Sequence, residues 1–188
     1  MARYFDGVDD KIVVTRTAAL DALMSSAYSI HLWLKTSTAV AAERLFCTAD
    51  ATEAYHTVIF NLPSVGKLKF YCRTGGDAAA VDSVTANLNN GAWRPLGFVR
   101  DDPNSKERIY VDGVEDANKA LPGASAGADW DLTIMNYSTE YLLGTLAEFA
   151  WWNVVLNANE YAALAKGISA CRIRPSALRV YLPLWGIG

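Results

Sequence analysis

Few residues in this chain have the types and spacing that catalysis or metal binding requires. The two histidines, His31 and His56, have no His-x-x-x-His or Cys-x-x-Cys spacing near them of the kind that builds a zinc site. The chain also lacks the Gly-x-x-x-x-Gly-Lys loop that holds phosphate groups. The sequence therefore predicts a protein without enzyme activity.

Aromatic side chains are the strongest binding signal, with six tryptophans and nine tyrosines. Their faces stack on sugar rings, and the same side chains anchor protein interfaces. Trp130 lies between two aspartates after a Gly/Ala-rich stretch, and Tyr137 and Tyr141 flank a polar loop, so we predict these three as exposed ligand contacts. The other tryptophans occupy strand-like patterns that predict packing in the core or on a sheet face: Trp33, Trp93, Trp151, Trp152 and Trp185.

Three cysteines, Cys47, Cys72 and Cys171, are too few and too scattered for a disulfide framework. Their odd number leaves at least one free thiol. Each has apolar or aromatic neighbours, which favours a buried cysteine that acts as a small hydrophobic residue.

Length and composition fit one compact domain over residues 1–188, with 52% hydrophobic and 20% charged residues. A chain of this length can bury roughly 70% of its unfolded surface without a metal or disulfide. No apolar run approaches the ~20 residues that cross a bilayer, so we expect no membrane insertion. The net charge is −3, and residues 166–188 contain four basic residues and no acidic one. An acidic body with a basic tail argues against nucleic acid as a partner.

Short segments of alternating polar and apolar residues dominate the chain. Residues 29–35 read Ser-Ile-His-Leu-Trp-Leu-Lys, which predicts a half-buried strand with aliphatic side chains on one face and Trp33 on the more polar face. Residues 56–62 and 67–73 alternate in the same way, and the turn-forming link 63–66 between them predicts a hairpin.

Later segments repeat this pattern, and about a dozen short strands predict an all-β fold, a two-sheet antiparallel sandwich. Asp112-Gly113 has the spacing of a two-residue type I′ hairpin. One short helix is expected near 157–167, where Asn157 and Glu160 match a capping box and an apolar stripe runs on to Ile168. Residues 17–24 are a weaker helix candidate.

Four ordered blocks resemble laminin G-like, or concanavalin A-like, jellyroll domains. The blocks are Phe5-Asp6-Gly7-Val8-Asp9-Asp10, the 29–35 segment, the region 91–113, and the closing segment 144–156. The resemblance implies a jellyroll over nearly the whole chain, with residues 172–184 as a final strand beside the first. The chain departs from the family at Ile134-Met135-Asn136, where relatives often have Ile-Gly, so loop 136–141 is expected to take a different path.

The resemblance also directs attention to carboxylates. Glycosidases of this superfamily use Glu-x-Asp-x-Glu along one strand, whereas Glu148 here stands alone. We expect it to pair with an arginine or to cap a backbone group. Laminin G-like domains often bind calcium through loop aspartates, which implies two candidate clusters or, alternatively, solvated turns. These are Asp6, Asp9 and Asp10 and, separately, Asp101 and Asp102 with Asn104.

Two functions from different classes remain open. The first is a structural module on the surface of a virion, as a capsid decoration or tail-associated protein that assembles with other virion or capsid proteins or with itself. The first residues lack the apolar stretch of a secretory signal, which fits a phage protein made in the host cytoplasm and located in the virion. The second is a lectin-like, glycan-binding domain of a bacterial protein, cytoplasmic or exported by a non-classical route. The fold permits both.

Overall fold

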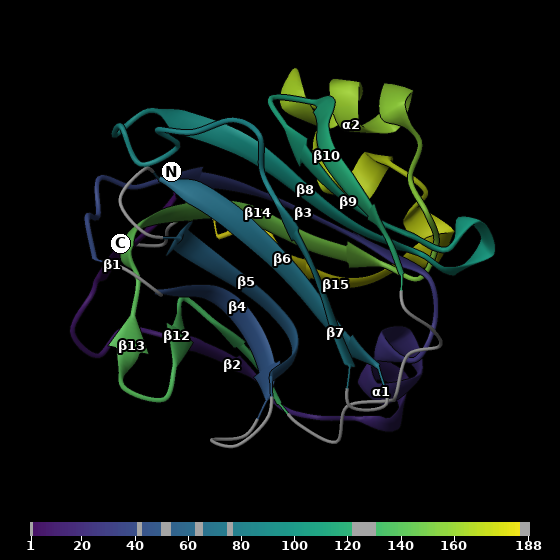
Figure 1. Ribbon diagram of the computed structural model, residues 1–188, viewed down its shortest axis with the longest axis horizontal. Helices are drawn as coiled ribbons and strands as arrows, with labels where there is room; N and C mark the ends of the chain where they lie inside the picture. The colour runs from purple at the N-terminus through teal and green to yellow at the C-terminus, as the bar shows by residue number, and fades with distance from the viewer. Residues whose placement is uncertain are drawn as a thin grey trace.

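Alternating inward and outward side chains build two antiparallel β-sheets that stack face to face in the computed structural model (Figure 1). The structure describes residues 2–40, 43–49, 54–62, 66–74, 77–121 and 131–184. The expectation of an all-β, two-sheet jellyroll sandwich is confirmed.

The larger sheet has the strand order β1-β14-β3-β8-β9-β10 within the described residues, and β15 also pairs with β14. Every strand pair in it is antiparallel. Its strands are β1 (Arg3–Asp6), β3 (Tyr28–Lys35), β8 (Trp93–Asp101), β9 (Lys106–Val111), β10 (Val114–Ala120), β14 (Leu143–Trp152) and β15 (Leu178–Leu182).

The smaller sheet has the order β2-β11-β4-β5-β6-β7, again antiparallel throughout its described part. Its strands are β2 (Ile12–Val14), β4 (Arg44–Ala49), β5 (Ala54–Leu62), β6 (Lys67–Thr74), β7 (Asp77–Asp82) and β11 (Leu132–Ile134). The predicted hairpin of residues 56–62 and 67–73 is β5–β6, with residues 63–65 of its link outside the described part. Loop 136–141 forms a separate hairpin of β12 (Asn136–Tyr137) and β13 (Glu140–Tyr141).

Both segments that favoured a helix form one, α1 (Ala18–Met24) and α2 (Ala158–Ala165). The capping box of α2 is present, since Asn157 Oδ1 accepts from the Glu160 N–H and Glu160 Oε2 accepts from the Asn157 N–H. Three 3₁₀ helices add single turns, η1 (Asp102–Asn104), η2 (Ala170–Arg172) and η3 (Pro175–Ala177). None of the helices in the described part has the length and apolarity needed to cross a membrane.

The core lies between the two sheets and is rich in aromatic rings. Phe46 of β4 contacts Phe98 of β8 and Phe149 of β14, with ring centroids 5.6 and 5.9 Å apart. The aliphatic face of β3 also points inward, as its alternation predicted. Phe70 of β6 completes the cluster from the smaller sheet, 5.6 Å from Phe98.

The larger sheet is covered on both faces in one half. Helix α2 packs on the outer face, where the Tyr161 ring stacks on Tyr110 with centroids 4.0 Å apart (Figure 1). Gly97 makes room for this contact, because a Cβ there would lie 2.2 Å from the Tyr161 ring. Ser29 and His31 are therefore buried as well. The prediction of a half-buried strand is wrong for this first half of β3.

The first and last strands share one edge of β14. β1 pairs with residues 143–146 and β15 with residues 149–152, so the two strands lie end to end. The expectation that the final strand lies beside the first is wrong.

Strand β14 has a bulge between the segments that pair with β1 and with β15. Glu148 has a φ of +53° there, and the pairing of β14 with β3 shifts register between Ala147 and Ala150. This bulge turns both Ala147 and Glu148 to the outer face.

The predicted type I′ turn is present, as the positive φ angles of Asp112 (+52°) and Gly113 (+82°) show.

The cysteines differ in burial. Cys47 is a buried free thiol, as predicted. Cys171 is exposed, so the prediction of burial is wrong there: it lies on η2, outside both sheets. The Cys72 side chain lies outside the described part.

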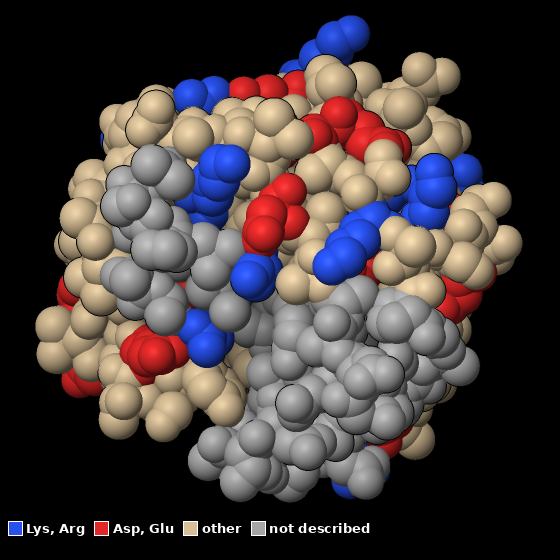
Figure 2. All heavy atoms as spheres, in the orientation of Figure 1, with Lys and Arg blue, Asp and Glu red and all other residues tan. Residues whose placement is uncertain are grey.

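Charges of both signs alternate on the face that the smaller sheet and β10 present. Figure 2 shows lysines and arginines interspersed with aspartates and glutamates over the described part of this face. An ion pair on the smaller sheet contributes to the mixing, Lys69 with Asp82 at 3.7 Å. This part of the surface therefore carries no continuous field of one sign.

We expect Gly97→Ala to lower the free energy of unfolding by about 2 kcal/mol, because the new Cβ would overlap the Tyr161 ring. In a Tyr161→Ala background the same change should cost less than about 0.5 kcal/mol, because the obstructing ring is absent. Urea denaturation of the wild type, both single variants and the double variant measures this coupling. Equal costs in both backgrounds would show that the ring does not pack on Gly97.

Burial lowers the pKa of His31 from 6.5 to about 3, against a smaller raising effect of its hydrogen bond with the Leu96 backbone. The unfolded chain takes up this proton near pH 6.5 and the folded protein does not. The stability that neutral His31 contributes is therefore complete above pH 6.5 and is lost as the pH falls toward 3. In denaturation series from about pH 8 to pH 4, the wild type should lose more stability than His31→Gln; parallel curves would contradict this.

Candidate functional site

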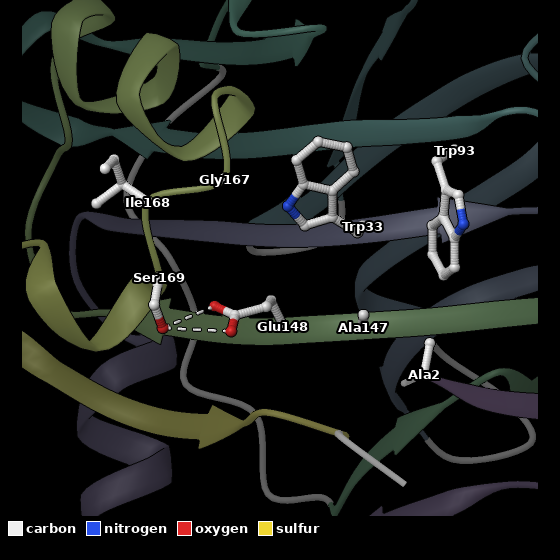
Figure 3. A pocket seen from close by; sticks show the side chains of 8 residues that line it. All are labelled: Ala2, Trp33, Trp93, Ala147, Glu148, Gly167, Ile168 and Ser169. Atoms are coloured by element: carbon white, nitrogen blue, oxygen red, sulfur yellow. Dashed lines mark hydrogen bonds between the residues drawn. The ribbon is translucent and has the colours of Figure 1, made fainter.

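The half of the outer face that α2 leaves uncovered holds a pocket of about 470 Å³ (Figure 3). It opens over β14, β3 and β8, beside the turn that follows α2. Its lining consists of Ala2, Trp33, Trp93, Ala147, Glu148 and the turn 167–169.

Strand register brings two tryptophans to this pocket. Alternation along β3 turns Trp33 outward, opposite Ala147 of β14 and Pro95 of β8. Trp93 lies two residues before Pro95 on the same face of β8, and 40% of its surface is exposed. Figure 3 shows the two indoles on adjacent strands. Because Ala147 is small, the space beside Trp33 stays open.

The turn after α2 forms the wall on the other side of Trp33 (Figure 3). Gly167 has a φ of +85°, a conformation that favours glycine and ends the helix. Ile168 was expected to continue the apolar stripe of the helix. It is instead 44% exposed, because α2 ends at Ala165, and it lines the pocket.

Glu148 fastens this wall to the sheet. Its Oε2 accepts a hydrogen bond from the Ala170 N–H at 2.9 Å, and its Oε1 accepts one from the Tyr181 hydroxyl at 2.9 Å. The Ser169 hydroxyl lies 3.2 Å from both carboxylate oxygens (Figure 3). Of the two roles expected for Glu148, capping a backbone group is the one that the structure shows.

This lining suits binding by contact with apolar surface. Two indoles and Ile168 supply aromatic and aliphatic faces, and flat ring faces stack on the apolar side of a ligand. Glu148 is the one carboxylate among the described lining residues, and both of its oxygens already accept hydrogen bonds.

The three aromatic residues predicted as ligand contacts do not line this pocket. Trp130 lies outside the described residues. Tyr137 and Tyr141 are half-buried on the β12–β13 hairpin. The guanidinium of Arg44 lies over the Tyr137 ring, 5.3 Å from its centroid, and covers one of its faces. A ligand role for these three residues stays a prediction.

The first acidic cluster stabilises a turn. Asp6 Oδ1 accepts a hydrogen bond from the Val8 N–H at 2.8 Å, and this bond lowers the pKa of the Asp6 carboxyl. Asp10 Oδ2 accepts from the Asp6 N–H at 3.2 Å, and Asp9 is exposed. These contacts occupy part of the oxygen set that calcium would need.

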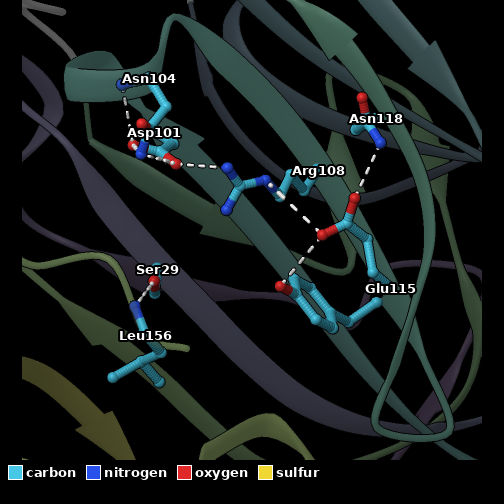
Figure 4. Close-up of polar contacts among 8 residues, drawn as sticks. Ser29, Asp101, Asn104, Arg108, Glu115, Asn118 and Leu156 are labelled. Carbon is cyan, nitrogen blue, oxygen red and sulfur yellow. Dashed lines mark hydrogen bonds and ion pairs between the residues drawn. The ribbon is translucent and has the colours of Figure 1, made fainter. Parts of the chain in front are cut away.

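The second acidic cluster is paired with arginines. Asp101 is buried, and its Oδ2 lies 2.6 Å from Arg108 (Figure 4). Asp102 Oδ1 lies 2.7 Å from Arg100, and the Asn104 amide donates to Asp101. In the described part of the chain, no three His, Cys, Asp or Glu side chains converge as metal ligands. Calcium at either cluster stays a prediction.

Trp33 and Trp93 were expected to pack rather than to line a pocket. The packing prediction is right for Trp151 and Trp152, which are fully buried, and Trp185 lies outside the described residues. The signal for Trp33 was its place on the polar face of its strand. The strand pattern alone gave no means of telling a covered outer face from an open one.

A family model for the concanavalin A-like lectin/glucanases superfamily matches residues 6–162, which is most of the chain. The chain belongs to this superfamily. The match agrees with the two-sheet fold and confirms the resemblance seen in the four sequence blocks. A search of the curated proteins finds no match.

Solved structures of this lectin-like fold are similar to the whole described sandwich. A Bacteroides ovatus protein described as carbohydrate-binding is 15% identical with a TM-score of 0.72; the match covers 96% of this chain, which spans about half (51%) of that protein. A sialidase CBM40 domain of Ruminococcus gnavus, bound to α2,3-sialyllactose, is 13% identical with a TM-score of 0.68, over 87% of this chain and 96% of that one. A pentraxin of Limulus polyphemus is 11% identical with a TM-score of 0.65, over 96% and 90%.

We expect Glu148→Gln to lower the free energy of unfolding by about 2 kcal/mol, because an amide replaces one of two acceptor oxygens in a buried site. Hydrogen exchange at the Ala170 amide should accelerate, because that N–H loses its carboxylate acceptor. Tyr181→Phe is the matched control, since it removes one donor and keeps the carboxylate. A Glu148→Gln variant no less stable than Tyr181→Phe, with unchanged exchange, would contradict the anchoring role.

Proposed function

We propose that this protein is a non-enzymatic carbohydrate-binding module and that the pocket at Trp33 and Trp93 is its binding site. The observation that carries the proposal is the pair of outward-facing indoles beside an open pocket, on the half of the sheet face that α2 leaves uncovered. Membership of the concanavalin A-like lectin/glucanases superfamily supports the carbohydrate-binding part of this proposal. So does the similarity to structures described as carbohydrate-binding or bound to a sialylated sugar.

The chemistry of the pocket lining suits one face of a sugar ring. Sugar rings have an apolar C–H face, and the indole of Trp33 offers a flat surface for it to stack on. Ala2 and Ala147 line the pocket with methyl groups only, which leaves room for the ring beside the indoles. The polar edge of the sugar would meet the turn 167–169, which the hydrogen bonds of Glu148 hold in place.

The lone carboxylate argues for binding without turnover. Glycoside hydrolysis needs two carboxyl groups facing the scissile bond, and Glu148 is the one carboxylate that lines the pocket in the described part of the chain. The spacing Gly-x-Ser-x-Gly of hydrolase nucleophile turns does occur at residues 123–127, outside the described part. That turn works between a strand and a helix of a parallel sheet, and the described sheets are antiparallel. Turnover of a glycan panel that Glu148→Gln or Ser125→Ala abolishes would contradict this part of the proposal.

We expect Trp33→Ala to lower the affinity for bound glycans at least tenfold, because the stacking surface is lost, and Trp93→Ala to act in the same direction. The measurement is a glycan-array screen of the wild type, followed by calorimetric titration of each variant with the best ligands. Circular dichroism checks that each variant is folded.

Tyr137→Ala and Tyr141→Ala are the matched controls, because they remove aromatic rings at the rim where the sequence had placed the ligand. They should leave the affinity within about twofold. Loss of binding in these two variants and not in Trp33→Ala would move the site to the β12–β13 hairpin. A wild type that binds no glycan would refute the proposed function.

A structural role in a virion, with capsid proteins or a second copy as partners, stays a prediction from the sequence. None of the contacts described above favours it over glycan binding. Co-purification with virus particles from the native source is the observation that would support it. Calcium titration by calorimetry decides whether the protein binds the ion, as predicted for the two aspartate clusters.

A further inference from the structure

A second hollow, of about 180 Å³, lies on the same outer face as the Trp33 pocket. Tyr4 of β1, Lys35 of β3 and Thr145 of β14 line it, together with Ser37 and Gly91 from the loops at the same end of the sheet. The Tyr4 side chain is 61% exposed. The hollow therefore has an exposed aromatic ring of its own.

Register makes the hollow and the pocket neighbours. Tyr4 pairs with Thr145, Thr145 with Lys35, and Lys35 with Trp93, so the four residues form one row across four strands. The Trp33 row lies two residues along the strands, about 6.8 Å away at about 3.4 Å per residue. Trp93 belongs to the row of the hollow and also lines the pocket. A ligand longer than one sugar unit can therefore touch both.

The two depressions differ in charge. Lys35 is exposed, and its ammonium forms no ion pair or hydrogen bond with another described residue. Among the residues that the structure describes, no acidic side chain lines the hollow. The nearby Thr36 hydroxyl is already used, since it donates to the Leu143 carbonyl at 2.5 Å and accepts from the Thr38 N–H. Lys35 is thus the group in the hollow that can recognise a ligand by charge.

We propose that the hollow is a second subsite that binds an anionic sugar unit, with Tyr4 stacking on its ring and Lys35 pairing with its carboxylate or sulfate. This rests on the proposed function and specifies its ligand class. The ligand is an oligosaccharide of at least two units. Its uncharged unit fills the pocket at Trp33, and its acidic unit lies over Lys35 and Tyr4.

The experiment uses the full chain on an array of neutral, uronate-containing, sialylated and sulfated glycans, followed by calorimetry. Acidic glycans of two or more units should bind best. Lys35→Gln should lower their affinity about threefold, as suits a solvent-exposed ion pair, and leave neutral glycans within the error. Raising the salt concentration should remove the difference between Lys35→Gln and the wild type. Lys119→Gln, which removes one exposed charge from β10, is the matched control and should have no effect.

Tyr4→Ala separates the two subsites. It should lower the affinity for disaccharides and longer glycans about tenfold, because a stacking ring is lost, and leave monosaccharide binding unchanged, whereas Trp33→Ala lowers both. Preferential binding of neutral glycans, or acidic binding that Lys35→Gln and Tyr4→Ala leave unchanged, would overturn the second subsite while the proposed function stands. Absence of all glycan binding would refute the proposed function itself.

Discussion

The bulge at Glu148 is the constraint on which the arrangement of the outer face depends. One extra residue in β14, held at a positive φ, shifts the pairing with β3 and places two consecutive side chains on the same side of the sheet. The carboxylate that this conformation turns toward the outer face accepts hydrogen bonds from the Ala170 N–H and the Tyr181 hydroxyl. The strain of one residue thereby fixes the path of the segment after α2, which forms a wall of the pocket.

The outer face of the larger sheet is consequently divided into two parts with different roles. In the first, Gly97 and Tyr110 receive Tyr161, and the helix and the C-terminal segment exclude water from β3 and β14. In the second, Trp33, Trp93 and Tyr4 stay accessible above small neighbours such as Ala147. If this face served stability alone, we would expect another element to cover its second part or polar side chains to line it. The proposed function explains its large aromatic side chains as contacts for a ligand.

Much of the fold could be predicted from local sequence, because alternation and turn chemistry are local properties. The aliphatic face of β3, the Asp112-Gly113 turn and the Asn157 capping box all formed as expected. Two features were beyond that reasoning. The burial of Ser29 and His31 depends on a helix more than a hundred residues later in the chain, and the end-to-end placement of β1 and β15 depends on the bulge. The site was missed for the same reason, since whether Trp33 faces a helix or solvent is decided by tertiary packing.

The end-to-end placement of the first and last strands has a topological consequence. Both run antiparallel to β14, and the Leu182 end of β15 faces the Arg3 end of β1 across the bulge. The two strands are thus halves of one interrupted edge strand, running in one direction. A circular permutant that joins these halves and opens the chain in a surface loop would keep every described strand pair. The fold therefore depends on the order of the strands across the sheet and not on where along the chain the two ends lie.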